Sequence, residues 1–171
     1  MNTKKNLVFL GMMGSGKSSI GHLVSNKLHL EFIDIDNLIE ERSGMTILEI
    51  FTKKGEEYFR NLEERITLKT LRSGFGKIIS LGGGGFINDK IREEVLANHF
   101  SFWLNWDESV IVKRIKNSNK RPLVFKSSDQ QIKNLIKKRS KIYSKAQFKI
   151  NCNKLKKNEI VKKIIKIYEL H

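Results

Sequence analysis

Residues 11–18 read GMMGSGKS, which fits the pattern G-x-x-x-x-G-K-S/T of a loop that binds phosphate groups. An apolar run at residues 7–10 precedes the loop and predicts a buried strand, and residues 18–28 follow it with the pattern of a helix. The glycines allow backbone N–H groups to close around phosphate oxygens, and the start of the helix adds a partial positive charge. The stretch therefore predicts a nucleoside-triphosphate site. The alternative is a glycine-rich turn that holds no ligand.

Two side chains of this loop are candidates for chemistry. Lys17 would reach the β- and γ-phosphates, where its charge would offset the negative charge that grows during phosphoryl transfer. The Ser18 hydroxyl would bind Mg²⁺. The loop thus predicts nucleotide binding but leaves the use of the triphosphate open.

The rest of the chain alternates short apolar strands with helices. Strands are expected at residues 7–10, 31–34, 77–81, 100–104 and 148–152. Helices are expected at residues 18–28, 36–42, 46–54, 56–71, 89–97, 108–116, 130–143 and 158–168. This alternation predicts one α/β domain over residues 1–171, with a parallel sheet covered by helices on both faces. Residues 117–129 are polar, lack a hydrophobic period and hold the only proline, so we expect a mobile loop there.

The chain has 33 Lys and Arg against 18 Asp and Glu, and the basic excess lies in its last third. Residues 113–171 hold 19 basic and 3 acidic side chains. Such a field attracts polyanions, either nucleic acid or the phosphates of a nucleotide, although lysines on solvated helix faces give the same composition. Because this region has no stacking-aromatic pattern and no known nucleic-acid module, we expect no nucleic-acid partner.

Three further features bound the class of protein. The single cysteine, Cys152, cannot form an internal disulfide, which favours a reducing, cytoplasmic compartment. No apolar run approaches the roughly 20 residues of a membrane span, so we expect no membrane partner. The four histidines lie far apart in the sequence without ligand spacing, which argues against a zinc site built by the protein.

Two aspartates stand at the end of the predicted strand at residues 31–34. Asp34 and Asp36 are two residues apart, and the carboxyl edge of a parallel sheet is where α/β proteins bind ligands. If the backbone stays extended, both side chains share one face. One could then hold a Mg²⁺-bound water while the other meets a substrate hydroxyl. Alternatively, Asp36 caps the following helix.

Two arginines are candidates for binding an anion. Arg139 lies on the apolar stripe of the predicted helix at residues 130–143, and an arginine turned inward needs an anionic partner. No acidic residue is near it in the sequence, which points to a ligand carboxylate, unless the side chain extends past the stripe to solvent. Arg60 could also bind a ligand, or it could pair with Glu56 and Glu64, four residues to either side.

Five more blocks of sequence follow the phosphate loop in a specific order. They read FIDID at 32–36, GEEYFR at 55–60, LGGG at 81–84, RPL at 121–123 and RSKIY at 139–143. Together with the loop, this ordered set resembles the shikimate kinases over nearly the whole chain. The resemblance implies transfer of the γ-phosphoryl group of ATP to the 3-hydroxyl of shikimate, giving 3-phosphoshikimate and ADP on the route to chorismate and the aromatic amino acids. Mg²⁺ would be the cofactor and ATP the co-substrate.

The resemblance also implies an architecture. It is a single-domain, three-layer α/β/α P-loop kinase with a five-stranded parallel sheet. Its phosphate loop would be residues 11–18, its helical substrate-binding segment residues 34–62, and its lid loop residues 117–129. We expect a monomer.

The resemblance further assigns roles to single residues. The catalytic residues would be Lys17, Asp36 and Arg121. The nucleotide would be bound by Gly14, Ser15, Gly16, Lys17, Ser18, Ser19, Arg114 and Arg121, with Arg114 near the adenine and Arg121 reaching over the phosphates from the lid. Shikimate would be bound by Asp36, Arg60, Gly83 and Arg139, and Mg²⁺ by Ser18 and Asp34.

The chain departs from the family pattern at two places. Gly85 stands where relatives often have another small residue, and residues 151–153 replace the Asp-containing turn that is common near the adenine pocket.

Three other functions stay open at this point: a kinase of the same fold for another small hydroxy acid such as gluconate, a nucleic-acid-binding P-loop protein, and a regulatory nucleotide-binding module without catalysis.

Overall fold

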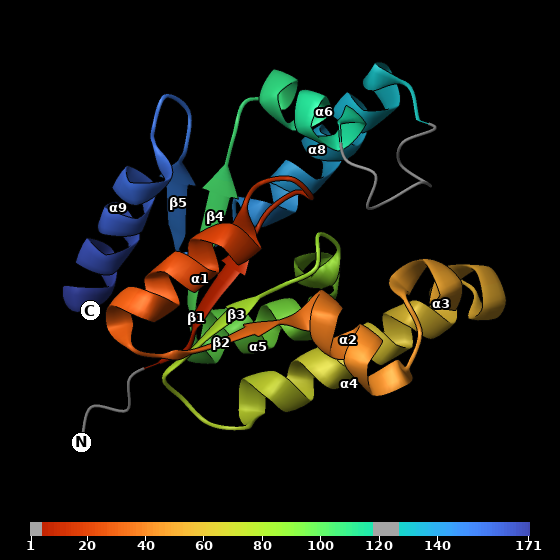
Figure 1. The fold of residues 1–171 in the computed structure, drawn as a ribbon, viewed down its shortest axis with the longest axis horizontal. Helices are drawn as coiled ribbons and strands as arrows, with labels where there is room; N and C mark the ends of the chain where they lie inside the picture. The colour runs from red at the N-terminus through yellow and green to blue at the C-terminus, as the bar shows by residue number, and fades with distance from the viewer. Residues whose placement is uncertain (1–4, 118–126) are drawn as a thin grey trace.

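The apolar run before the phosphate loop forms the central strand β1 (Leu7–Leu10), all four residues of which are buried. The computed structural model describes residues 5–117 and 127–171. Around β1 the sheet continues with β2 (Glu31–Asp34), β3 (Lys77–Ser80), β4 (Phe100–Asn105) and β5 (Phe148–Asn151). The spatial order is β2-β3-β1-β4-β5 and every pairing is parallel (Figure 1). The predicted five-stranded parallel sheet is therefore confirmed.

The register places the phosphate loop at the middle of the carboxyl edge of the sheet. Leu7 pairs with Ile78 of β3 on one side and with Phe100 of β4 on the other. Since β1 is flanked on both sides, the loop that leaves it opens at the point where α/β sheets bind ligands. Two strands end one residue earlier than predicted, although the Leu81 and Cys152 amides still donate to neighbouring strands, to Phe9 O at 3.0 Å and Asn105 O at 2.9 Å.

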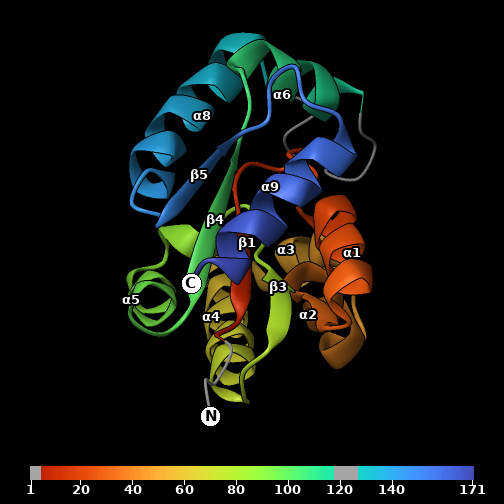
Figure 2. The ribbon, with the colours of Figure 1, turned by 90° about the vertical axis from the view of Figure 1, so that its left-hand side faces the viewer.

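Alternate residues of β1 face two separate layers of helices. Leu7 and Phe9 pack in a cluster with side chains of α1 (Lys17–Leu28) and α9 (Lys157–Glu169). Val8 and Leu10 belong to a second cluster on the opposite face. The helices of that side are α2 (Ile35–Ser43), α3 (Ile47–Lys54), α4 (Glu56–Arg72), α5 (Asp89–Asn98), α6 (Glu108–Lys116) and α8 (Asp129–Tyr143). Figure 2 shows α1 and α9 on one side of the strands and α5 and α8 on the other.

Two glycines separate the helices of the segment between β2 and β3, at the gaps between the predicted helix ranges. Gly44 ends α2 with φ of 65°, and Gly55 stands between α3 and α4 with φ of 86°, both in the region that other residues rarely adopt. After β3 come four consecutive glycines, Gly82–Gly85, called the glycine run below. The sequence did not predict the short 3₁₀ helix at Gly85–Ile87, which begins on the last of these glycines. In the part of the chain that the structure describes, no helix is both long and apolar enough to span a bilayer.

Candidate functional site

The phosphate loop holds its lysine close to its own backbone. Lys17 is 8% exposed, and its Nζ donates to Gly11 O at 2.9 Å and to Met12 O at 3.0 Å. Gly14 and Gly16 adopt φ of 76° and 88°, which lets the chain turn tightly before α1. The ammonium group therefore lies inside the curve of the loop, where the backbone N–H groups at the start of α1 can also meet an anion.

Asp34 connects this loop to the neighbouring strand. Its Oδ2 accepts a hydrogen bond from Ser18 Oγ at 2.5 Å, and its Oδ1 accepts from the backbone N–H of Asn37 at 3.3 Å. Asp34 is thus the residue that caps α2, and the suggestion that Asp36 is the cap is wrong. The backbone does not stay extended as far as Asp36, because β2 ends at Asp34 and Asp36 lies in the first turn of α2. Ser18 and Asp34 still bring together two oxygen ligands of the kind that Mg²⁺ prefers.

Asp36 lies against the glycine run that follows β3. A Cβ built on Gly82 would stand 2.6 Å from Asp36 Oδ1 and 2.9 Å from Glu63 Oε1. The missing side chain of Gly82 therefore lets two carboxylates approach one point of the backbone. Asp36 Oδ1 is itself buried, whereas the residue as a whole is half-buried.

Arg60 forms an ion pair that the sequence analysis missed. Its Nη1 donates to Glu63 Oε2 at 2.8 Å and its Nη2 to Glu56 Oε1 at 3.4 Å. Of the two alternative partners considered for Arg60, Glu56 is therefore present, whereas Glu64 instead accepts from Asn88 and Lys90, both at 2.7 Å. A Cβ on Gly84 would collide with Arg60 Nη1, so the guanidinium rests against the glycine run.

Glu63 itself is 2% exposed and holds Arg60 from the buried side of α4. The signal that could have found it is its position three residues after Arg60, among the apolar residues of the helix. A buried carboxylate destabilises the fold unless an opposite charge pairs with it, and Arg60 supplies that charge.

Arg139 is turned inward, as its place on the apolar stripe predicts. Ile132 and Ile136 of the same helix are buried, and Arg139 Nη1 is buried too. Within residues 5–117 and 127–171, this nitrogen has no hydrogen-bond partner. A Cβ on Gly83 would lie 3.3 Å from it, so Arg139 reaches the same glycine run as Arg60 and Asp36. A buried guanidinium nitrogen without a partner is suited to an incoming anion.

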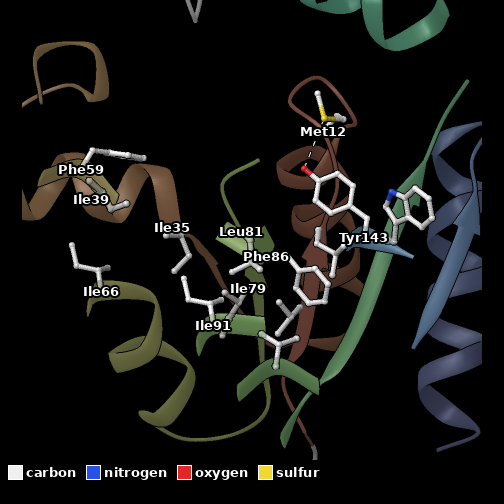
Figure 3. Close-up of a cluster of buried hydrophobic side chains, with 14 of the residues drawn as sticks. Met12, Ile35, Ile39, Phe59, Ile66, Ile79, Leu81, Phe86, Ile91 and Tyr143 are labelled. Carbon is white, nitrogen blue, oxygen red and sulfur yellow. Dashed lines mark hydrogen bonds between the residues drawn. The ribbon is translucent and has the colours of Figure 1, made fainter. Parts of the chain in front are cut away.

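Tyr143 holds the backbone of the glycine run at Gly83 through a hydrogen bond. The sequence pattern placed Tyr143 on the apolar stripe of its helix and did not predict this role. Tyr143 is 1% exposed, and its hydroxyl donates to Gly83 O at 2.5 Å. The same hydroxyl points at Met12 Sδ of the phosphate loop, 3.8 Å away (Figure 3). Tyr143 therefore links α8, the glycine run and the phosphate loop.

The other end of the phosphate loop borders a cavity of about 300 Å³. It is lined by Gly14, Ser15, Gly16, Ser19, Ile20, Trp106, Arg114, Lys157 and Ile160. Arg114 Nη1 donates to Gly14 O at 3.1 Å, so Arg114 is not a simple solvated helix residue. Asn153, in the turn that departs from the family pattern, exchanges hydrogen bonds with Asp107 at 2.8 and 2.9 Å and so joins β5 to the start of α6.

A larger cavity of about 490 Å³ lies beside the edge strand β2, and among the described residues that line it Asp34 is the only predicted site residue. The phosphate loop contributes to the lining of the smaller cavity and, among the described residues, not to that of the larger one. Arg121 and most of the expected lid at residues 117–129 lie outside the described residues. The remaining predicted residues meet along the carboxyl edge of the sheet, with the phosphate loop at its centre and two carboxylates and two guanidinium groups around Gly82–Gly84.

Known proteins match this chain over nearly its whole length, both in sequence and in structure. A family model described as "Shikimate kinase" matches residues 13–169. A shikimate kinase from Thermodesulfovibrio yellowstonii is 40% identical over 166 residues, which cover 96% of this chain and 95% of that relative. The crystal structure of shikimate kinase from Aquifex aeolicus superposes with a TM-score of 0.85 at 37% identity, covering 96% of each chain. Shikimate kinase from Acinetobacter baumannii, in complex with shikimate, gives a TM-score of 0.88 at 28% identity over 95% of this chain and 92% of that one.

Proposed function

Because the chain belongs to the shikimate kinase family, we propose that it transfers the γ-phosphoryl group of ATP to the 3-hydroxyl of shikimate, giving 3-phosphoshikimate and ADP. One observation carries the proposal. The inward guanidinium of Arg139, the guanidinium of Arg60 and the carboxylate of Asp36 all meet the glycine run that lies beside the phosphate loop. This arrangement suits a small acceptor that carries both a carboxylate and hydroxyl groups.

The two arginines are proposed to hold the carboxylate of shikimate. A guanidinium group presents a planar fork that matches the two oxygens of a carboxylate. Arg139 offers a buried nitrogen, and Glu63 holds Arg60 from behind at 2.8 Å. Gly83, whose carbonyl is fixed by Tyr143, would let the ring of the substrate approach the backbone.

Asp36 is proposed to orient the acceptor hydroxyl and to accept its proton. A carboxylate can act as a general base when it lies within hydrogen-bond reach of the proton that it removes. Asp36 is held at the start of α2 and against Gly82, so its oxygen stays fixed relative to the two arginines. A fixed position of this kind lowers the entropic cost of reaching the reactive geometry.

Charge on the triphosphate is proposed to be offset by Lys17 and, from residues outside the described part, by Arg121. The backbone of Gly14, Ser15 and Gly16, with the side chains of Ser18 and Ser19, would complete the phosphate site. Ser18 and Asp34 would hold Mg²⁺, which when bound neutralises charge on the phosphate oxygens. Arg114 would lie beside the adenine.

We further propose a cytoplasmic monomer in which residues 34–62 bind the substrate and residues 117–129 form the lid. No nucleic-acid partner is part of this proposal. If the basic last third bound a polyanion, that binding would weaken steeply with rising salt, which a filter-binding titration would show.

An ADP-release assay with a set of acceptors tests the function. ATP and Mg²⁺ would be offered with shikimate, gluconate, quinate or a nucleoside monophosphate. We expect release with shikimate only. Equal release with gluconate would indicate the related hydroxy-acid kinase, and ATP binding without release for any acceptor would indicate a regulatory module. Either result would contradict the proposal.

A further inference from the structure

Trp106 lies between β4 and α6 and joins two parts of the nucleotide site that are distant in the sequence. Its indole Nε1 donates to the carbonyl oxygen of Ser15 at 2.9 Å, across 91 residues of chain. Its ring packs against both hydrophobic clusters, which fixes it from behind. The indole is therefore anchored to the phosphate loop as well as to the core.

Arg114 lies on this indole. The guanidinium carbon is 4.0 Å from the ring centroid, closer than in the other cation–ring contacts of the described residues, which measure 4.8 to 5.3 Å. Tryptophan offers the most favourable ring face to a cation, and a planar guanidinium stacks on it. One nitrogen of Arg114 is also held by Gly14 O at 3.1 Å. These two contacts fix both the plane and the edge of the guanidinium.

A guanidinium has two faces, and the indole covers one of them. Arg114 and Trp106 both line the cavity of about 300 Å³ that borders Gly14–Gly16 and Ser19. The π face of a purine stacks on a flat cation in the same way as an indole does. The second face of Arg114 thus offers a preformed surface for the base of a nucleotide whose phosphates occupy the loop.

We infer that Trp106 is a positioning residue for the nucleotide: it holds Arg114 as a flat platform on which the adenine of ATP stacks. The inference rests on the proposed use of ATP and adds a residue that no motif of the sequence indicated. Its physical basis is preorganisation, because a long arginine side chain that is already fixed loses less entropy when the base binds.

If Trp106 only stabilised the fold, its replacement would change the KM of both substrates to a similar extent. The test therefore measures the KM of each substrate separately. ATP KM, shikimate KM and kcat would be measured for wild type, Trp106→Phe, Trp106→Ala, Arg114→Ala and the double variant Trp106→Ala/Arg114→Ala. Lys149→Ala is the matched control, because it removes the exposed cation above the other tryptophan, Trp103, outside the cavity.

We expect Trp106→Ala to raise ATP KM about tenfold, equivalent to about 1.4 kcal/mol, with shikimate KM changed less than twofold. Trp106→Phe keeps a ring under Arg114 and should raise ATP KM about threefold. In the Arg114→Ala background, Trp106→Ala should add less than twofold, since the platform is already lost. Lys149→Ala should match wild type. An unchanged ATP KM in Trp106→Ala, or equal rises in both KM values, would overturn the inference.

Binding measurements keep the inference separate from the proposed reaction. Calorimetry would give the Kd of ADP and of inorganic tripolyphosphate, which lacks a base, for wild type and Trp106→Ala. Only ADP should weaken, by about tenfold, and equal weakening of both ligands would contradict the platform. Trp103→Phe leaves Trp106 as the only tryptophan, and its fluorescence should change on ADP addition. If wild type binds ADP but does not phosphorylate shikimate, the proposed function fails while these binding results still decide the inference; if wild type does not bind ADP, both fail.

Discussion

Replacing Gly82 by alanine should disable the site without a change in its charged groups. The new Cβ would stand 2.6 Å from Asp36 Oδ1 and 2.9 Å from Glu63 Oε1, whereas ordinary contact begins near 3.4 Å. The Asp36 oxygen would therefore have to move by roughly 0.8 Å, and a displacement near 1 Å costs about 100-fold in rate when a reacting group is misplaced. Because the same push acts on Glu63, Arg60 should also shift and shikimate KM should rise.

Gly85→Ala is the matched control in the same glycine run. Its Cβ would meet Leu81 Cβ at 3.4 Å and Glu63 Oε1 at 3.7 Å, both ordinary contacts, and neither glycine has a positive φ. Steady-state ADP release with shikimate, together with a thermal melt of each variant, gives the comparison. We expect kcat to fall about 100-fold for Gly82→Ala and less than threefold for Gly85→Ala. A folded Gly82→Ala variant with more than half of the wild-type kcat, or an equal loss in both variants, would refute this reasoning.

Three other predictions follow from the charged and buried groups. Arg139→Lys keeps the charge but loses the planar fork, so shikimate KM should rise about 100-fold, for a contact worth about 2–3 kcal/mol, while ATP KM changes less than twofold; equal effects on both KM values would place Arg139 outside the carboxylate site. Lys17→Ala should lower kcat by at least about 100-fold with an unchanged melting temperature, and near-normal turnover of the folded variant would remove Lys17 from catalysis. Burial lowers the pKa of His99 below its usual 6.5, with Lys5 adding to the decrease and Glu94 opposing it. The His99 imidazole therefore binds a proton more readily in the unfolded chain than in the folded one. The contribution of neutral His99 to the free energy of unfolding is complete above about pH 6.5 and is lost as the pH falls below that value. Urea unfolding at pH 7.5 and 5.5 gives the free energy of unfolding at each pH. The difference between the two values should be smaller for His99→Phe than for wild type, whereas His29→Asn, at an exposed position, should keep the wild-type difference.

The parts of the site that the sequence predicted are those set by local pattern. The strand before the phosphate loop, the loop itself and the inward side of the helix that carries Arg139 follow from apolar periodicity and glycine spacing. These patterns depend only on neighbours in the chain. The resemblance then supplied the roles that periodicity could not.

The parts that the sequence missed depend on where one element ends or on contacts between distant segments. Asp34 and Asp36 would share one face only if the backbone stayed extended, but the strand ends at Asp34 and that residue caps α2. The sequence offered Glu64 as a partner of Arg60 and did not indicate Glu63. On a helix, residues three and four positions after Arg60 can both pair with it, and only the packing of α4 decides between them. Trp106 meets Ser15 across 91 residues, a contact that no local pattern encodes.

Phosphorus NMR of the reaction mixture tests the central claim most directly. The protein would be incubated with ATP, Mg²⁺ and shikimate, and the spectrum would be correlated with the protons of the product. The account predicts loss of the γ-phosphate signal of ATP and growth of one phosphomonoester coupled to the proton on carbon 3 of shikimate. A product with the phosphate on another hydroxyl, or conversion of the γ-phosphate to inorganic phosphate alone, would contradict it.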